Sequence, residues 1–401
     1  MKEILVSQPN YVTHFSCVGA ACRDHCCQRW EISLDKTTYN KYIKSEIPNI
    51  RKIAQEHISV GKKSVQNWAR MFLDNQGNCF YLNEQRLCEI HKQLGPGALS
   101  NTCTTYPRVT KIYKKEEFKS LNISCPEAVK QVLFNPDALL SESSSHIKDS
   151  YYSQPAMDSE GRLINLFCAN LMQVAQPQVE HNIYAIIYFI LAAEKAQGSL
   201  DNKLQSMEAA YQAITLQMQD GQLAASLQNI SEMQTLEMQL LSNLQKHMLT
   251  TQGLRGQATL LSYMHKLNAF FPQEASDQQL SSNLKQLKSA WQDIALPCLE
   301  QRHYILRNFW QYRLYHDQFG FKRTGSLLKD LYLIMADYFF IKSLLSASVI
   351  EKGELIDDDI IDVMYSYSTF RQHQSTVQQR FSDEIDLCKR GDDLSLVRLL
   401  V

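Results

Sequence analysis

The chain is poor in the two residues that most often interrupt regular structure. Its 401 residues include 14 glycines and 10 prolines, about half the combined usage of roughly 12 % in average proteins. Because both residues break helices, their scarcity favours long helical segments. No G-x-G-x-x-G sequence is present, which argues against the glycine-rich phosphate loop of dinucleotide-binding folds.

The chain also lacks an excess of charge of either sign. It has 41 lysines and arginines against 42 aspartates and glutamates, a net charge of −1. Affinity for a phosphate backbone requires clustered cationic side chains, so we expect no nucleic-acid partner. The basic segment 108–119, which contains Lys111, is interrupted by Glu116 and Glu117, and this pattern favours a solvated face.

An export signal and a long uninterrupted apolar run are missing as well. The start, MKEILVSQPN, does not have the pattern of a signal peptide. Of the two longest apolar stretches, Tyr184–Ala193 is too short to span a bilayer, and Leu331–Ile350 carries Asp337 and Lys342. We predict buried core helices and no transmembrane segment, with peripheral membrane contact left open. The expected location is the reducing cytoplasm, where eleven cysteines do not form a disulfide framework.

The cysteines divide the chain into two parts. Eight of the eleven lie between Cys17 and Cys125, and a stretch containing Pro136, Pro155, Gly161 and several serines follows. Such a composition is typical of loops. We therefore predict a mainly α protein with a cysteine-rich, loop-containing metal-binding domain at 1–134, a linker at 135–161 and an α-helical bundle domain at 162–401.

The second part shows helical periodicity with few interruptions. Apolar residues alternate at spacings of three and four, which places them on one helix face. Ser276 and Gln279 have the spacing of a capping box at the start of one such segment. The two apolar series are Leu204, Met207, Tyr211, Ile214 and Met218, and Leu280, Leu284, Leu287 and Trp291.

Four cysteines in eleven residues form the strongest chemical signal. The intervening residues include Arg23, Asp24 and His25, which a hydrophobic core would not contain beside a buried cysteine. A second set of four cysteines follows, each next to polar or turn-forming residues. We predict that both sets supply metal-binding thiolates. The first set is Cys17, Cys22, Cys26 and Cys27, and the second is Cys79, Cys88, Cys103 and Cys125.

Thiolates suit both zinc and iron–sulfur clusters. Only Cys22 and Cys26 have the paired spacing usual for structural zinc, and the adjacent pair Cys26-Cys27 is awkward for one ion because neighbouring side chains diverge. The pattern thus favours an iron–sulfur cluster, of the 4Fe-4S type, with zinc as the alternative. The histidines are better explained as surface residues or partners of ligands than as ligands themselves; they are His14, His25 and His91.

These motifs resemble a known family, the proteins with a zinc- or iron-chelating CxxCxxCC domain, and within it the flagellin lysine N-methylases. The likeness is specific over about residues 1–130 and weaker at His303–Phe321. This chain has four and three residues between its first cysteines instead of two and two. The matching motifs are Cys26-Cys27, Cys79–Leu82, Cys88–His91, Cys103–Arg108 and Ser124–Ala128.

The resemblance implies a protein-lysine N-methyltransferase that moves a methyl group from S-adenosylmethionine to lysine ε-amines of flagellin before export. Without a glycine loop, the methyl donor is expected either on an open iron or between the two domains. No catalytic or cofactor-binding residue is assigned, because Asp24, Tyr81 and Tyr106 are each better explained as structural. The alternatives are a non-enzymatic protein-binding module folded by a structural zinc and a redox protein.

Overall fold

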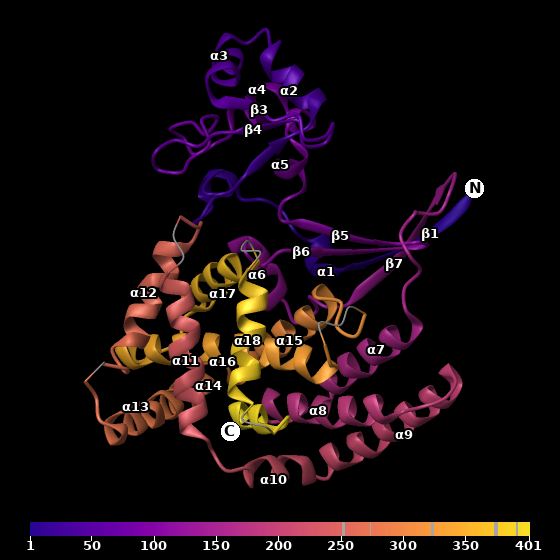
Figure 1. Cartoon of the computed structure of the whole chain (residues 1–401), viewed down its shortest axis with the longest axis vertical. Coiled ribbons are helices and arrows are strands. Elements are labelled where there is room, and N and C mark those ends of the chain that lie inside the picture. Colours follow the sequence, from indigo (N-terminus) through magenta and orange to yellow (C-terminus); the bar gives the residue numbers. More distant parts are fainter. Residues whose placement is uncertain (251–252, 273, 322–324, 373–375, 390–391) are drawn as a thin grey trace.

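The computed structural model of the chain describes residues 1–250, 253–272, 274–321, 325–372, 376–389 and 392–401. Its buried side chains form two separate hydrophobic cores. Figure 1 shows a small body containing α2–α5 at the top, a twisted sheet in the middle and the helices of the C-terminal region below. The predicted fold class, a cysteine-rich region with loops followed by a helical region, is confirmed.

The elements follow in a simple order along the chain. The strands are β1 (Lys2–Pro9), β2 (Ile32–Leu34), β3 (Ile58–Val60), β4 (Ala69–Met71), β5 (Arg108–Tyr113), β6 (Glu116–Leu121) and β7 (Ser141–Lys148). The helices of the first half are α1 (Asn10–Thr13), α2 (Lys36–Ile43), α3 (Pro48–His57), α4 (Glu89–Leu94), α5 (Asn101–Thr105), α6 (Pro126–Leu133), α7 (Ser159–Gln173) and α8 (Val179–Lys195). The remaining helices are α9 (Leu200–Gln219), α10 (Gln222–Gln228), α11 (Gln234–Leu249), α12 (Gln257–Asn268), α13 (Asp277–Ala290), α14 (Leu296–Cys298), α15 (Tyr304–His316), α16 (Leu327–Lys352), α17 (Asp357–Gln372) and α18 (Val377–Cys388).

The small body is built around a three-stranded antiparallel sheet. Its strand order is β2-β4-β3, and Met71 lies opposite both Ile32 and Ile58. Asp35 caps the N-terminus of helix α2. Its carboxylate accepts a hydrogen bond from the Thr38 amide at 2.9 Å, a standard N-terminal cap. The core of this body is small and includes Cys79 among its buried residues.

A four-stranded sheet joins the small body to the helices. Its order is β5-β6-β1-β7, with β1 parallel to β6 and antiparallel to β7. Ile4 and Val6 of β1 are buried, and Tyr11 and Val12 of α1 continue into the larger core. The first strand of the chain is therefore packed with residues far away in sequence.

Strand β7 lies inside the stretch 135–161 that the sequence predicts to be a linker. It pairs with β1 from Lys2↔Lys148 to Pro9↔Ser141. Its residues are almost all exposed, because it is an edge strand. An exposed strand rich in serine has the composition of a loop, so composition alone did not reveal it.

Helix α16 runs through the centre of the helical region. Ser326 caps its start by accepting a hydrogen bond from the Lys329 amide at 3.1 Å, and Gly353 ends it in the left-handed conformation with φ of +79°. Among the described residues, it is the one helix whose length and composition would allow it to cross a membrane. However, 89 % of its most apolar 18-residue window is buried inside the protein. This supports the predicted core helix at Leu331–Ile350.

The predicted helical periodicity is confirmed in α9 and α13. Met207, Ile214 and Met218 of α9 are buried in the larger core. Ser276 caps α13 by accepting a hydrogen bond from the Gln279 amide at 3.3 Å. A single π-helical turn, Trp291–Ala295, carries the chain from α13 to α14.

Candidate metal centre

Three thiols of the small body interact electrostatically. The Cys27 side chain lies close enough to those of Cys26 and Cys88 for the three groups to shift one another's pKa values. Interaction with Cys27 lowers the pKa of Cys26 and that of Cys88. The pKa of Cys27 is raised instead, because Cys26 and Cys88 beside it favour its protonated form.

Local backbone pairing explains why these residues meet. The Cys79 amide donates to the Cys27 carbonyl at 2.8 Å, and isolated bridges join Gln28 to Asn78 and Leu82 to Cys88. Cys88 then stands at the N-cap of α4. Short antiparallel contacts thus bring one predicted cysteine set against the other, although some sixty residues separate them in sequence.

Two further thiols complete this part of the cluster. Cys79 and Cys103 both lie within electrostatic range of Cys88 and of each other. Burial raises the pKa of Cys79 to about 12 and that of Cys103 to about 11. The Ser100 hydroxyl oxygen caps the start of α5 by accepting a hydrogen bond from the Cys103 amide nitrogen at 3.2 Å.

The other three cysteines of the predicted sets lie beside this cluster. Cys22 is within electrostatic range of Cys17 and Cys26, and Cys125 is within range of Cys22. Burial is the main cause of the raised pKa of Cys22 and of Cys125, the latter reaching about 12. Each of the eight thiols thus has at least one other within electrostatic range, and we call these eight residues the thiol cluster.

The thiol cluster fits a soft metal centre by its chemistry. Thiolates are the preferred ligands of zinc and of iron–sulfur clusters, and the small core around them buries few other side chains. Within the described residues, no group of three or more histidine, cysteine, aspartate or glutamate side chains surrounds the position of a single ion. The choice of ligands within the cluster stays a prediction.

The three histidines that the sequence predicts to be surface residues or partners of ligands are exposed or half-buried. His14 and His91 are exposed. His25 is half-buried, and burial lowers its pKa. Its Nδ1 atom is buried without a hydrogen-bond partner.

A residue from the helical region, Arg255, reaches into the thiol cluster and was missed by sequence reasoning. Its Nη2 atom donates to the Tyr106 hydroxyl and the Ser124 carbonyl, and its Nε atom lies 3.7 Å from Asp24 Oδ2. Burial alone would lower the pKa of Arg255, but Tyr106 and Asp24 raise it above the ordinary value. Arg255 is also within electrostatic range of Cys26.

The three candidate bases are held in structural contacts. Asp24 accepts a hydrogen bond from Gln28, and burial raises its pKa against the opposing effect of Arg255. The Tyr81 hydroxyl donates to the Ile50 carbonyl at 3.1 Å. Tyr106 contacts Arg255 and exchanges a 3.0 Å hydrogen bond with the Ser124 hydroxyl.

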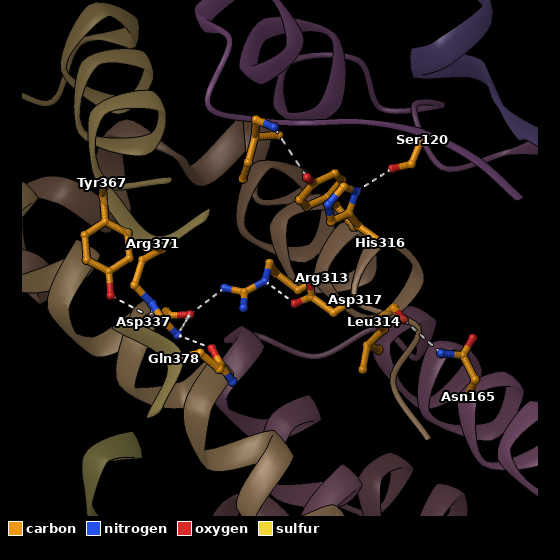
Figure 2. A network of polar contacts seen from close by, with 12 residues as sticks. Ser120, Asn165, Arg313, Leu314, His316, Asp317, Asp337, Tyr367, Arg371 and Gln378 are labelled. Atoms are coloured by element: carbon orange, nitrogen blue, oxygen red, sulfur yellow. Dashed lines mark hydrogen bonds and ion pairs between the residues drawn. The ribbon is translucent and has the colours of Figure 1, made fainter. Parts of the chain in front are cut away.

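A second polar network lies deep in the helical region, where sequence reasoning assigned no function. Asp337 of α16 accepts hydrogen bonds from Arg313 Nη1 at 2.8 Å, from Arg371 Nε at 2.6 Å and from the Tyr367 hydroxyl at 2.6 Å. Figure 2 shows Arg313 between Asp337 and Asp317. Burial alone would raise the pKa of Asp337, but Arg371 and Arg313 outweigh it and lower that pKa.

The same view includes the contacts of α15 with the central sheet. His316 Nδ1 exchanges a 2.7 Å hydrogen bond with the Ser120 hydroxyl, and burial lowers the pKa of His316 to about 4. Lys111, expected on a solvated face, is half-buried and donates to the His316 carbonyl. Asn165 holds the end of α15 by donating to the Leu314 carbonyl at 2.9 Å.

A cavity of about 320 Å³ adjoins this network. We call it the α15–α18 cavity, because helices α15, α16, α17 and α18 supply most of its wall. The residues important below are Phe309, Arg313, Asp337, Ile341, Arg371 and Gln378.

Comparison with known proteins assigns both parts of the chain. Residues 16–126 match the CxxCxxCC zinc- or iron-chelating domain, and residues 165–399 match the FliB lysine N-methylase C-terminal domain. The chain belongs to the FliB lysine N-methylase family. It is a protein-lysine N-methyltransferase with a metal-binding domain, as the resemblance implies.

Relatives of this family match along the whole chain. The Lysine-N-methylase of Salmonella choleraesuis (strain SC-B67) is 37 % identical and that of Salmonella typhimurium (strain LT2) is 36 % identical, each over 100 % of both chains. The Flagellar biosynthetic protein FliU of Salmonella muenchen is 50 % identical over 140 residues, which cover 35 % of this chain and 83 % of FliU. No solved structure matches.

Proposed function

We propose that this lysine N-methylase transfers methyl groups from S-adenosylmethionine to lysine ε-amines of flagellin in the cytoplasm. The observation that carries the proposal is the 37 % and 36 % sequence identity over the full length with two proteins named Lysine-N-methylase. Flagellin as the substrate is supported by the relatives FliU and FliV, which are named flagellar biosynthetic proteins. A cytoplasmic location follows from methylation of the subunit before its export.

The reaction is a substitution at carbon. The lysine nitrogen uses its lone pair to form a bond to the methyl carbon while the bond from that carbon to the sulfonium sulfur breaks, which leaves S-adenosylhomocysteine. Lysine titrates near 10.4 in water, so the substrate must lose a proton before it reacts. The protein must therefore desolvate or deprotonate the ammonium and align it with the methyl carbon.

We further propose that the thiol cluster holds a metal group, an iron–sulfur cluster of the 4Fe-4S type. Its ligands would come from Cys26, Cys27 and Cys88, which shift one another's pKa values, together with one or more of the neighbouring thiols. When bound, such a cluster would supply electron transfer or an open iron that chelates an amino acid. The residues around it have a separate task, since Arg255 and Tyr106 tie the cysteine loops to the helices.

Structural zinc is the competing assignment for the same thiols. The small body has few buried residues in its core, and small cores often depend on a bound metal for stability. In this alternative the metal folds the N-terminal region and takes no part in methyl transfer.

Metal analysis of protein purified without oxygen separates these assignments. Iron with acid-labile sulfide and a brown absorption spectrum is the expected result. One zinc per chain in a colourless sample would overturn the iron–sulfur assignment.

Methylation is tested separately with radiolabelled S-adenosylmethionine and purified flagellin. We expect label in flagellin, and none in flagellin whose lysine amines have been chemically blocked. Absence of transfer by active, metal-loaded protein would refute the proposed reaction.

A further inference from the structure

We propose that the α15–α18 cavity binds the amino-acid end of S-adenosylmethionine, with the ligand carboxylate on Arg371 and Arg313. This inference rests on the proposed function, because that function supplies the ligand. Two guanidinium groups of the cavity wall have hydrogen-bonding capacity left over.

Arg371 carries the first unused donor. Its side chain is only 7 % exposed. The Nε atom donates to Asp337 at 2.6 Å, and Nη2 donates to Gln378 at 3.3 Å. Its Nη1 atom is buried and has no hydrogen-bond partner among the residues that the structure describes. A buried cationic N–H group without an acceptor is costly and rare in folded proteins, so an acceptor from a ligand would complete it.

Arg313 carries the second unused donor. Its Nε atom donates to Asp317 at 2.6 Å and its Nη1 atom to Asp337 at 2.8 Å. The Nη2 atom makes no hydrogen bond to any of the described residues, and Figure 2 draws none from it. Both arginines line the cavity and contact Asp337, and the proposal gives their remaining nitrogens the two oxygens of one carboxylate.

The charges around the cavity select the kind of ligand. Among the described lining residues, three cationic side chains stand against three carboxylates, and His316 is neutral because its pKa is about 4. A bare anion would therefore leave the cavity with excess negative charge, whereas a zwitterion would not. An α-amino acid carries one carboxylate and one ammonium group. The charged residues of the lining are Lys111, Arg313 and Arg371 with Asp317, Asp330 and Asp337.

The remaining wall suits the rest of the donor molecule. Phe309, Ile334 and Ile341 supply apolar surface, and the volume of about 320 Å³ lies within the range of about 300–1,000 Å³ that is usual for small-molecule sites. Lys111 and Ile123 of the N-terminal region also line the cavity. The cavity thus lies where the two parts of the chain meet, one of the two places that the sequence suggested for the methyl donor.

The test compares two ligands that differ in the amino-acid end. Binding of S-adenosylhomocysteine and of 5′-methylthioadenosine, which lacks the amino-acid end, is measured by calorimetry on the full-length protein and on Arg371→Lys. The lysine side chain keeps the positive charge but lacks the paired nitrogens with which a guanidinium group binds both oxygens of a carboxylate. We expect the affinity for S-adenosylhomocysteine to fall at least about tenfold, the loss of one charge-assisted hydrogen bond, with the affinity for methylthioadenosine unchanged.

Arg302→Lys is the matched control, because Arg302 makes an exposed pair with Asp357 at 2.7 Å outside the cavity. If the wild-type protein binds S-adenosylhomocysteine and Arg371→Lys binds it equally well, the cavity is not the site while the proposed function stands. If the wild-type protein binds neither compound and transfers no methyl group, the proposed function fails.

A second variant covers the case in which Arg371→Lys loses both ligands through a damaged fold. Gln378 is exposed and lines the cavity, so Gln378→Trp obstructs it from the surface without disturbing the core. Loss of S-adenosylhomocysteine binding in this variant, with an unchanged melting temperature, supports the site. Undiminished binding overturns it.

Discussion

Removal of the Asp337 carboxylate tests the physical account of the helical region most severely. Asp337 is fully buried and balances two arginines, with contacts of 2.8 Å to Arg313 and 2.6 Å to Arg371. In Asp337→Ala both guanidinium groups stay in place, and Arg371 loses its carboxylate partner. Breaking one side of a buried ion pair costs about 3–5 kcal/mol, because an uncompensated charge is left behind.

The exposed pair of Arg302 and Asp357 provides the comparison. Its contact of 2.7 Å is as short as the buried ones, but the Asp357 side chain is 51 % exposed. Exposed pairs contribute about 0–1 kcal/mol. The free energy of unfolding should therefore fall several-fold more in Asp337→Ala than in Asp357→Ala, although the chemical change is identical.

Thermal and urea unfolding monitored by circular dichroism measure the difference. For a helical unit of this size a loss of 3–5 kcal/mol lowers the melting temperature by roughly 6–20 °C. Equal melting temperatures for Asp337→Ala and Asp357→Ala would refute the reasoning, since they would show that the buried network contributes no more than a surface pair.

Three further predictions concern the thiol cluster, its link to the helices and the dependence on pH. Cys27→Ser should lose most of the bound metal in elemental analysis, because Cys27 interacts with two other thiols. Cys298→Ser, which lies outside the cluster, should keep its metal. Metal retained by both variants would contradict the assignment. Arg255→Ala should lower the free energy of unfolding by about 1.5–3 kcal/mol for each lost charged hydrogen bond and speed proteolysis of the small body; an unchanged cleavage rate would count against this link. The pKa of buried His316 is about 4 in the folded protein and about 6.5 in the unfolded chain. Its neutral ring therefore contributes to the free energy of unfolding above pH 6.5, and this contribution, about 3 kcal/mol in all, is lost as the pH falls toward 4. His316→Gln should flatten this dependence in urea titrations, and identical slopes for both proteins would contradict it.

Much of the fold could be predicted from the sequence, because helical periodicity and capping are local signals. The apolar spacing from Leu204 to Met218 and the cap at Ser276 both correspond to observed helices. Strand β7 could not be predicted in this way. Its pairing with β1 depends on a partner more than a hundred residues away, and an exposed edge strand has no apolar alternation to reveal it.

The candidate site was predictable only in part, for the same physical reason. Cysteine spacing pointed to eight thiols, and their role as metal ligands stays a prediction. The approach of Cys27 to Cys88 depends on backbone bridges that include one between distant loops, which spacing does not show. Arg255 has no motif of its own; the one local signal is its position between Gly253 and Gly256, both with positive φ, which form the turn that directs it toward Tyr106.

The sequence shows the charged residues of the helical region but does not show that they pair with one another in the core. Asp337 was recognised as a charge within an apolar run, which argued against a membrane segment. Its partners Arg313 and Arg371 lie on other helices, and a lone arginine in a helical pattern is ordinarily a surface residue. Only the packing of α15, α16 and α17 shows that these residues form one network beside a cavity.

The most direct test of the account is tandem mass spectrometry of flagellin incubated with the metal-loaded protein and S-adenosylmethionine carrying a deuterated methyl group. The account predicts deuterated methyl groups on lysine side chains with the wild-type protein, and far fewer with Cys27→Ser. Flagellin that stays unlabelled with the wild-type protein, or carries the label only on residues other than lysine, would contradict it.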